Sequence, residues 1–212
     1  MYYFVGASLP ELRIGVTPEL TFDEFTQLLE LNLSNPDFKK AEAIKRYYDI
    51  QNIRAFLNKE ALDLYGSYNE KELEEALVSQ TGFPEYVFEL LHSPDLLEAY
   101  FENEIKDSSG FLREFMTFER DWRLVFMKLR SNQPVEEYPE LKAIYEEGGP
   151  MQMHRALYEY RFNMINEMCG LEQFSLKKIL GYMVQLILAE KWSKLDHDKG
   201  KEFMDQLIRR TS

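Results

Sequence analysis

Two polar residues, Asp49 and Asn52, interrupt the helix-forming stretch YYDIQNIRAFLN at residues 47–58. At about 100° per residue they share one side of a helix with Phe38, Ala41 and Phe56. A carboxylate and a carboxamide on a core-facing stripe could transfer protons, hold a cation or satisfy nearby polar groups. We predict that they hydrogen-bond each other or a neighbouring helix end, because buried polar groups need partners. The alternative is that this face borders a groove for a partner protein.

A metal centre would need several histidine, cysteine or carboxylate ligands at fixed spacings. The chain has one Glu-x-x-His pair, Glu89 with His92, whereas a di-iron bundle needs two such pairs and two further glutamates. His154 and His197 have no acidic residue three positions before them, and Cys169 is the single cysteine. The sequence therefore predicts no metal site, and His92 is expected to be exposed at a helix end.

Nucleotide-binding and nucleophile motifs are also missing from the sequence. It contains no GxxxxGK[ST] and no GxGxxG, and the run Gly148-Gly149-Pro150 does not match a phosphate-binding loop. Cys169 lies near a predicted helix end without a pattern that would activate its thiol. We therefore predict no cofactor and no catalytic site. An enzyme that uses acidic residues stays as a third interpretation, which would require a closed pocket with convergent carboxylates.

Composition narrows the classes of partner. The 212 residues are 45% hydrophobic, enough for a sizeable core in one domain or two small ones, and the net charge is −12. Such a charge repels nucleic acid and anionic membranes. It is expected mainly to keep the protein soluble, and a basic protein partner is the alternative. The N-terminus does not resemble a secretory signal, which indicates a cytoplasmic protein. The most apolar stretch, residues 180–192, is shorter than a membrane span and predicts a buried helix.

Capping patterns and apolar periodicity predict an all-α protein of tandem helical units with long central helices. Thr21 with Glu24, and Asn69 with Glu72, form capping-box patterns. Helices are predicted at 22–33, 36–58, 71–79, 83–92, 93–105, 111–130, 140–147, 151–168, 175–195 and 201–210. The stretch YYFVGA, residues 2–7, has strand-like content and is predicted as a short extended segment. We place an N-terminal unit at 1–107 and a C-terminal unit at 108–212, or one continuous domain.

The two longest early helices show a weak similarity, which indicates either an internal repeat or a chance likeness of two amphipathic helices. A shift of 72 residues without a gap lays DIQNIRAFLN, residues 49–58, on DWRLVFMKLR, residues 121–130. Asp49 then meets Asp121, while Asn52 meets Leu124. Asp121 lies about a quarter turn from the centre of the apolar stripe of the second helix, so a solvated flank is its expected position.

These helix motifs resemble the repeated helix of the C/d component of V-type (archaeal-type) ATPases. The whole chain is still more similar to a bacterial uncharacterised family encoded with V-type ATP synthase subunits. The matching stretches are YYFVGASLPEL, DIQNIRAFL, TGFPEYVFELL, FLREFMTFERDWRLVFMKLR, HRALYEYRFNMINEM and KILGYMVQLILAEKWSKLDHDKG. The C/d component has three helical units, whereas this chain shows two copies of the motif and an incomplete third in AEKWSKLDHDKG, residues 189–200.

The resemblance implies a non-catalytic coupling or adaptor subunit. It would act as a socket between the membrane rotor ring and the central stalk of a rotary ATPase that transports protons or sodium ions. Its partners would be stalk and ring proteins, and it would reach the membrane only through the ring. The polar residues expected to organise the units or meet a partner are Asp49, Asn52, Glu119, Asp121 and Arg130. The alternative is a general helical scaffold that binds a partner helix, unconnected with an ATPase.

Overall fold

The computed structural model describes residues 2–136, 138–146 and 149–195, and in these ranges the chain is all-α with no strand. The helices are α1 (Tyr3–Ser8), α2 (Phe22–Asn32), α3 (Asn35–Leu57), α4 (Glu70–Ser79), α5 (Glu85–Glu89), α6 (Leu96–Asp107), α7 (Phe111–Arg130), α8 (Pro139–Glu146), α9 (Pro150–Cys169) and α10 (Leu176–Ser193). The predicted all-α class is confirmed for these residues. The predicted helix 201–210 and the end of the incomplete third motif copy lie outside the described residues.

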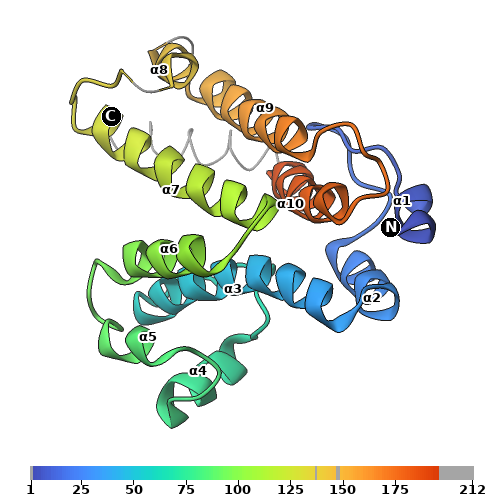
Figure 1. The fold of residues 1–212 in the computed structure, drawn as a ribbon. Coiled ribbons are helices and arrows are strands. Elements are labelled where there is room, and N and C mark those ends of the chain that lie inside the picture. Colours follow the sequence, from blue (N-terminus) through green and yellow to red (C-terminus); the bar gives the residue numbers. More distant parts are fainter. Residues whose placement is uncertain (1, 137, 147–148, 196–212) are drawn as a thin grey trace.

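Helix α10 is the centre of the fold (Figure 1). An unbroken run from Ile179 to Ala189 is buried, which confirms that the most apolar stretch is a buried helix. Helix α9 packs along it as a hairpin partner, and α2, α3, α7 and α1 contact its other sides. None of the described helices has both the length and the apolar character needed to cross a bilayer.

Two hydrophobic clusters form the interior. The larger one contains residues from α1 to α7, α9 and α10, so it includes side chains from both sides of the predicted boundary at 107/108. The smaller one lies among α7, α8 and α9 and consists of Val125, Leu129, Val135, Leu141 and Leu157. The second half of α7 therefore has its own partners, away from α10.

The helix starts follow the predicted chemistry. Thr21 and Glu24 form a capping box at α2, and Asn69 and Glu72 form one at α4. Each box pairs two backbone N–H groups that have no partner within the helix. At α3 the proline at the first turn begins a helix of 23 residues, about 34 Å at 1.5 Å per residue.

The prediction of an extended segment at YYFVGA was wrong, since residues 3–8 form helix α1. Val5 alone is buried in this helix, whereas Tyr3 and Phe4 are 60% and 68% exposed. The backbone N–H of Tyr2 donates to the carbonyl of Phe174 at 3.0 Å, and the N–H of Gly6 donates to the carbonyl of Tyr2 at 3.0 Å. A strand would need a neighbouring strand, and the described part of the chain has none, so the turns of α1 and the carbonyl of Phe174 satisfy these backbone groups instead.

Helices α9 and α10 approach closely at Gly181. A Cβ added there would lie 1.9 Å from the Cys169 sulfur, while its next neighbours, in Phe111 and Ile165, would lie at ordinary distances of 3.5 and 3.6 Å. Residue 181 is therefore limited to glycine by a single neighbouring atom, the Cys169 sulfur, which a larger side chain would overlap.

Gly181→Ala is expected to destabilise the protein by about 1–3 kcal/mol, because the added methyl group overlaps the thiol. In a Cys169→Ala background the same change should stabilise by up to about 1 kcal/mol, since alanine favours helix over glycine. Urea denaturation of the four proteins measures this sign change. An equal cost in both backgrounds would show that the thiol is not the obstacle.

Candidate functional site

Asp49 and Asn52, the polar pair within YYDIQNIRAFLN, are 2% and 1% exposed in α3. The Asn52 amide donates to the carbonyl of Asp63 at 2.9 Å and accepts from its N–H at 2.7 Å. Asp49 Oδ1 accepts from the N–H groups of Ser67 and Tyr68 at 2.6 and 3.3 Å. The prediction that the two residues bond each other or a helix end was therefore wrong about the partner. They hold the backbone of the loop between α3 and α4.

Gly66 lets this loop lie against α3. A Cβ at residue 66 would lie 2.3 Å from Asp49 Oδ1 and 3.0 Å from the Asn52 amide nitrogen. Burial raises the pKa of the Asp49 carboxyl above its usual range, against the opposing effect of the two N–H donors. Asp49 is thus a backbone acceptor for the loop, with no free position for a ligand on the bonded oxygen.

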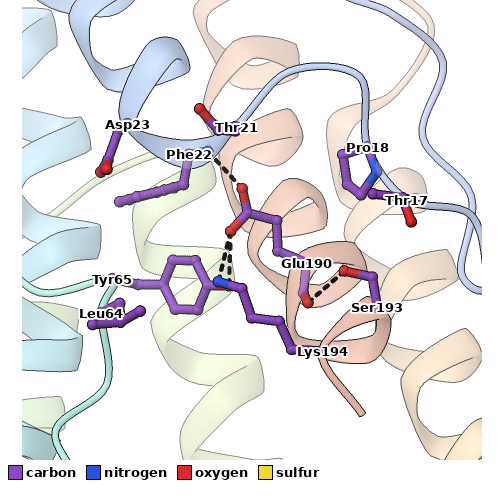
Figure 2. Close-up of a pocket in the computed structure, with 10 residues that line it drawn as sticks. All are labelled: Thr17, Pro18, Thr21, Phe22, Asp23, Leu64, Tyr65, Glu190, Ser193 and Lys194. Atoms are coloured by element: carbon purple, nitrogen blue, oxygen red, sulfur yellow. Dashed lines mark hydrogen bonds and ion pairs between the residues drawn. The ribbon is translucent and has the colours of Figure 1, made fainter. Parts of the chain in front are cut away.

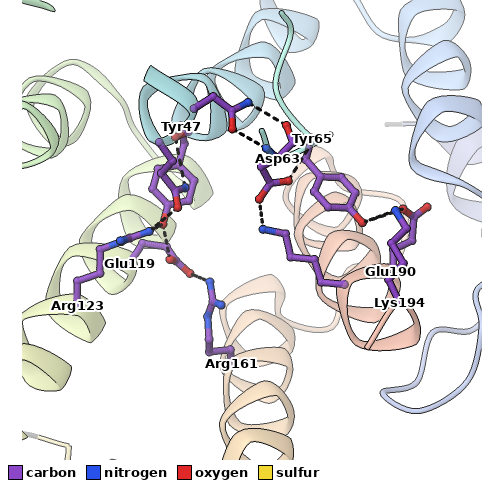
Figure 3. Close-up of polar contacts among 11 residues, drawn as sticks. Tyr47, Asp63, Tyr65, Glu119, Arg123, Arg161, Glu190 and Lys194 are labelled. Carbon is purple, nitrogen blue, oxygen red and sulfur yellow. Dashed lines mark hydrogen bonds and ion pairs between the residues drawn. The ribbon is translucent and has the colours of Figure 1, made fainter. Parts of the chain in front are cut away.

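A second polar centre lies where α3, α7 and α9 meet, around Glu119 (Figure 3). Glu119 is 1% exposed, and its carboxylate accepts from the Tyr47 hydroxyl at 2.8 Å and from the Arg161 guanidinium. Arg123 donates to the same hydroxyl at 2.8 Å and to Gln51 Oε1 at 2.7 Å. One carboxylate and two guanidiniums therefore connect three helices.

The charges of this centre balance one another. Burial raises the pKa of the Glu119 carboxyl, but the charges of Arg161 and Arg123 outweigh burial, so the pKa lies below its usual value. Arg161 also lies over the Trp122 ring, with its guanidinium carbon 5.4 Å from the ring centroid. Glu119 is therefore an ionised structural anion rather than a proton donor.

A third centre joins the loop to α10 and α2. Asp63 pairs with Lys191, whose ammonium lies 4.7 Å from the centroid of the Tyr48 ring. Burial lowers the pKa of Lys191, and the charge of Asp63 opposes this effect. The Glu190 carboxylate accepts from Tyr65 at 2.9 Å and from the backbone N–H of Phe22 at 2.6 Å. Glu190 thus serves the first turn of α2, where a negative charge is favourable.

The first and third centres share Asp63, which bonds both Asn52 and Lys191, and the centre around Glu119 is joined to them through the backbone of α3. We call the three centres together the polar network. We use this name for Tyr47, Asp49, Gln51, Asn52, Asp63, Tyr65, Glu119, Arg123, Arg161, Glu190, Lys191 and Lys194. Through α3 and the loop it ties α2, α7, α9 and α10 together.

A hollow of about 420 Å³ opens beside the third centre (Figure 2). It is lined by Thr17, Pro18, Thr21, Phe22, Asp23, Leu64, Tyr65, Glu190, Ser193 and Lys194. Both oxygens of Glu190 already accept hydrogen bonds, from Phe22 on one side and from Tyr65 and Lys194 on the other. Burial and the neighbouring carboxylate raise the pKa of Tyr65, so its hydroxyl keeps its proton. The described residues also hold no group of three or more potential metal ligands.

The predicted site residues fall into two groups. Asp49, Asn52 and Glu119 lie inside the molecule, in the polar network. Asp121 lies at the side of α7, where its carboxylate accepts from Arg120 at 2.8 Å, and Arg130 is exposed in the last turn. The structure does not bring Asp121 or Arg130 to the other three.

The sequence did not predict most residues that bond to Asp49, Asn52 and Glu119, although the alignment of the two long helices indicates two of the observed contacts. The shift of 72 residues also lays Tyr47 on Glu119 and Gln51 on Arg123, and both pairs are in contact. The long helices α3 and α7 are therefore in side-chain contact at positions that the shift of 72 residues aligns.

A family model described as "Protein of unknown function (DUF2764)" matches residues 1–134 and 132–212. A protein of Chlamydia muridarum is 22% identical over 255 aligned positions, which cover 96% of both chains. A protein of Chlamydia pneumoniae is 23% identical over 97% of both chains. Both are described as uncharacterized proteins. No solved structure is significantly similar.

Asp49→Ala is expected to lower the free energy of unfolding by about 1–3 kcal/mol, because two backbone donors of the loop lose their acceptor. Asp49→Asn keeps an acceptor oxygen and should cost less. The matched control is Asp121→Ala, at the aligned position of α7, which removes a part-exposed pair with Arg120 and a long 3.5 Å bond from Tyr138 and should change stability by about 1 kcal/mol or less. Urea denaturation compares the three. Unchanged stability of Asp49→Ala together with lost partner binding would instead place Asp49 at an interface.

Glu119→Gln is expected to cost about 3–5 kcal/mol at neutral pH, since the fully buried anion is lost and the part-buried guanidiniums of Arg161 and Arg123 keep their charge without it. The folded pKa of Glu119 lies below its ordinary value of 4.5, so its stabilisation is present above that pH and is lost as the pH falls through the folded pKa. The difference between wild type and variant should therefore shrink in acid. The control is Glu114→Gln, which lies on α7 like Glu119 but removes only an exposed ion pair with Lys177 of α10. A difference that does not change with pH would contradict the ionised state of Glu119.

Proposed function

The chain belongs to the family described as Protein of unknown function (DUF2764), and we propose that it acts as a non-catalytic coupling or adaptor subunit of a V-type ATP synthase or ATPase. It would be a socket between the membrane rotor ring and the central stalk in rotary proton or sodium transport. It would work in the cytoplasm and reach the membrane through the ring. The similarity of its long helices to the repeated helix of the V-type C/d component supports this proposal.

The observation that carries the proposal is that the charged groups of the polar network bond to one another across different helices. A subunit that transmits torque must not let its helices slide past one another under load. Glu119 is bonded from α3 and α9 at once, and the Asp63 carboxylate joins the loop to α10. Sliding would separate the buried Glu119 and the part-buried Asp63 from their partners at a cost in free energy. The arrangement is therefore suited to a rigid body.

An enzymatic role finds less support in the same groups. Catalytic acids and bases need free, accessible atoms near a bound substrate. The carboxylates of Glu119 and Glu190 accept hydrogen bonds on both of their oxygens, and Asp49 binds the loop backbone. We therefore propose a mechanical rather than a chemical role.

Purification from native membranes tests the proposal. A tagged chain, expressed at its own level and extracted with mild detergent, is expected to bring down the stalk and rotor-ring subunits of a V-type ATPase, identified by mass spectrometry. The matched control is an equally acidic tagged protein from the same cells, because charge alone attracts basic proteins. Recovery of the chain without stalk or ring subunits would contradict the proposal. A different constant partner would then support the general scaffold.

A further inference from the structure

The negative charge of the chain is concentrated in one segment. Residues 60–107 contain thirteen aspartates and glutamates but only two lysines, so they carry a net −11 of the total −12. The remaining 164 residues are almost neutral. Eleven of the thirteen carboxylates are exposed, so the charge faces solvent. We call residues 60–107 the acidic segment.

The acidic segment contains α4 and α5, which lie at the edge of the molecule away from α10 (Figure 1). Salt bridges within the described residues neutralise few of its charges: Asp63 pairs with Lys191, Glu75 with Lys71 and Glu104 with Arg46. This edge therefore presents uncompensated negative charge.

A groove of about 500 Å³ lies on this edge, where the chain turns from α4 into α5. Its lining consists of Gln80, Phe83, Glu85, Phe88 and Glu89. The two phenyl rings lie edge to face with centroids 6.3 Å apart, and both are only partly buried. The groove therefore offers two aromatic side chains to a partner.

Two carboxylates flank these rings. In α5, Phe88 and Glu89 follow Glu85 by three and four residues, so both lie on the same side of the helix as Glu85. Both glutamates are exposed, and neither forms a salt bridge with any residue in the described ranges. A cation over an aromatic ring and beside carboxylates is attracted by both.

We propose that this groove docks an arginine- or lysine-bearing segment of a partner protein, with the cation between Glu85 and Glu89 and against Phe83 and Phe88. The charge complementarity favours a basic polypeptide, since nucleic acid and anionic lipid would be repelled. The long-range field of the acidic segment speeds the encounter, and the aromatic groove fixes where the segment binds. The inference goes beyond the rotary-ATPase proposal and does not depend on it.

The test uses the full chain and a fluorescein-labelled amphipathic peptide with four arginines and three leucines, measured by fluorescence anisotropy at physiological salt. The double variant Glu85→Gln/Glu89→Gln is expected to weaken binding about five-fold or more, because two direct charge contacts are lost. The control Glu30→Gln/Glu172→Gln removes the same net charge from exposed positions outside the acidic segment and should change the affinity less than about two-fold.

Phe88→Leu separates the aromatic contribution from the charge, since it keeps an apolar side chain but removes the ring face. It is expected to weaken binding while circular dichroism shows a folded protein. Equal weakening by the double variant and by its control would contradict binding in the groove, because the peptide would then be attracted only by the net charge of the whole protein. Absence of binding to the wild-type chain would also overturn it. Neither result affects co-purification with ATPase subunits, so the two proposals fail separately.

Discussion

The cost of burying an unpaired charge is the constraint on which the rest of this structure depends. Glu119 is almost fully buried, and an isolated carboxylate there would cost several kcal/mol. Tyr47, Arg161 and, through Tyr47, Arg123 remove that cost only if α3, α7 and α9 keep one relative position. Apolar side chains alone tolerate some sliding, whereas these directed bonds do not. The related cost of leaving buried polar groups unpaired explains the loop between α3 and α4, whose backbone at Asp63 and Ser67 is paired by Asn52 and Asp49 of α3.

The sequence predicted the helices where their ends have local chemistry. The boxes at Thr21 and Asn69 mark helix starts because the capping atoms lie three residues away. The prediction of an extended segment at YYFVGA was wrong because aromatic and β-branched content favours a strand only when another strand is present to pair with it. Whether the chain divides at residue 107/108 stays a prediction.

The candidate site was predictable in part. The periodicity placed Asp49 and Asn52 on a buried face, but their partners are loop backbone groups whose position depends on tertiary contacts. Arg161 lies 42 residues from Glu119, and Lys191 lies 128 residues from Asp63, so no local spacing predicts these pairs. A shift of 72 residues aligns Tyr47 with Glu119, but an alignment of two helices does not by itself predict that the aligned side chains touch.

The central claim is that the polar network makes α3, α7 and α9 one rigid body. Native-state hydrogen exchange in increasing urea measures it most directly, because it reports the free energy at which each helix opens. We expect the amides in the turns around Tyr47, Glu119 and Arg161 to exchange through one common opening with the same free energy. If the turn around Arg161 opened several kcal/mol more easily than the turn around Tyr47, the helices would move independently and the claim would be contradicted.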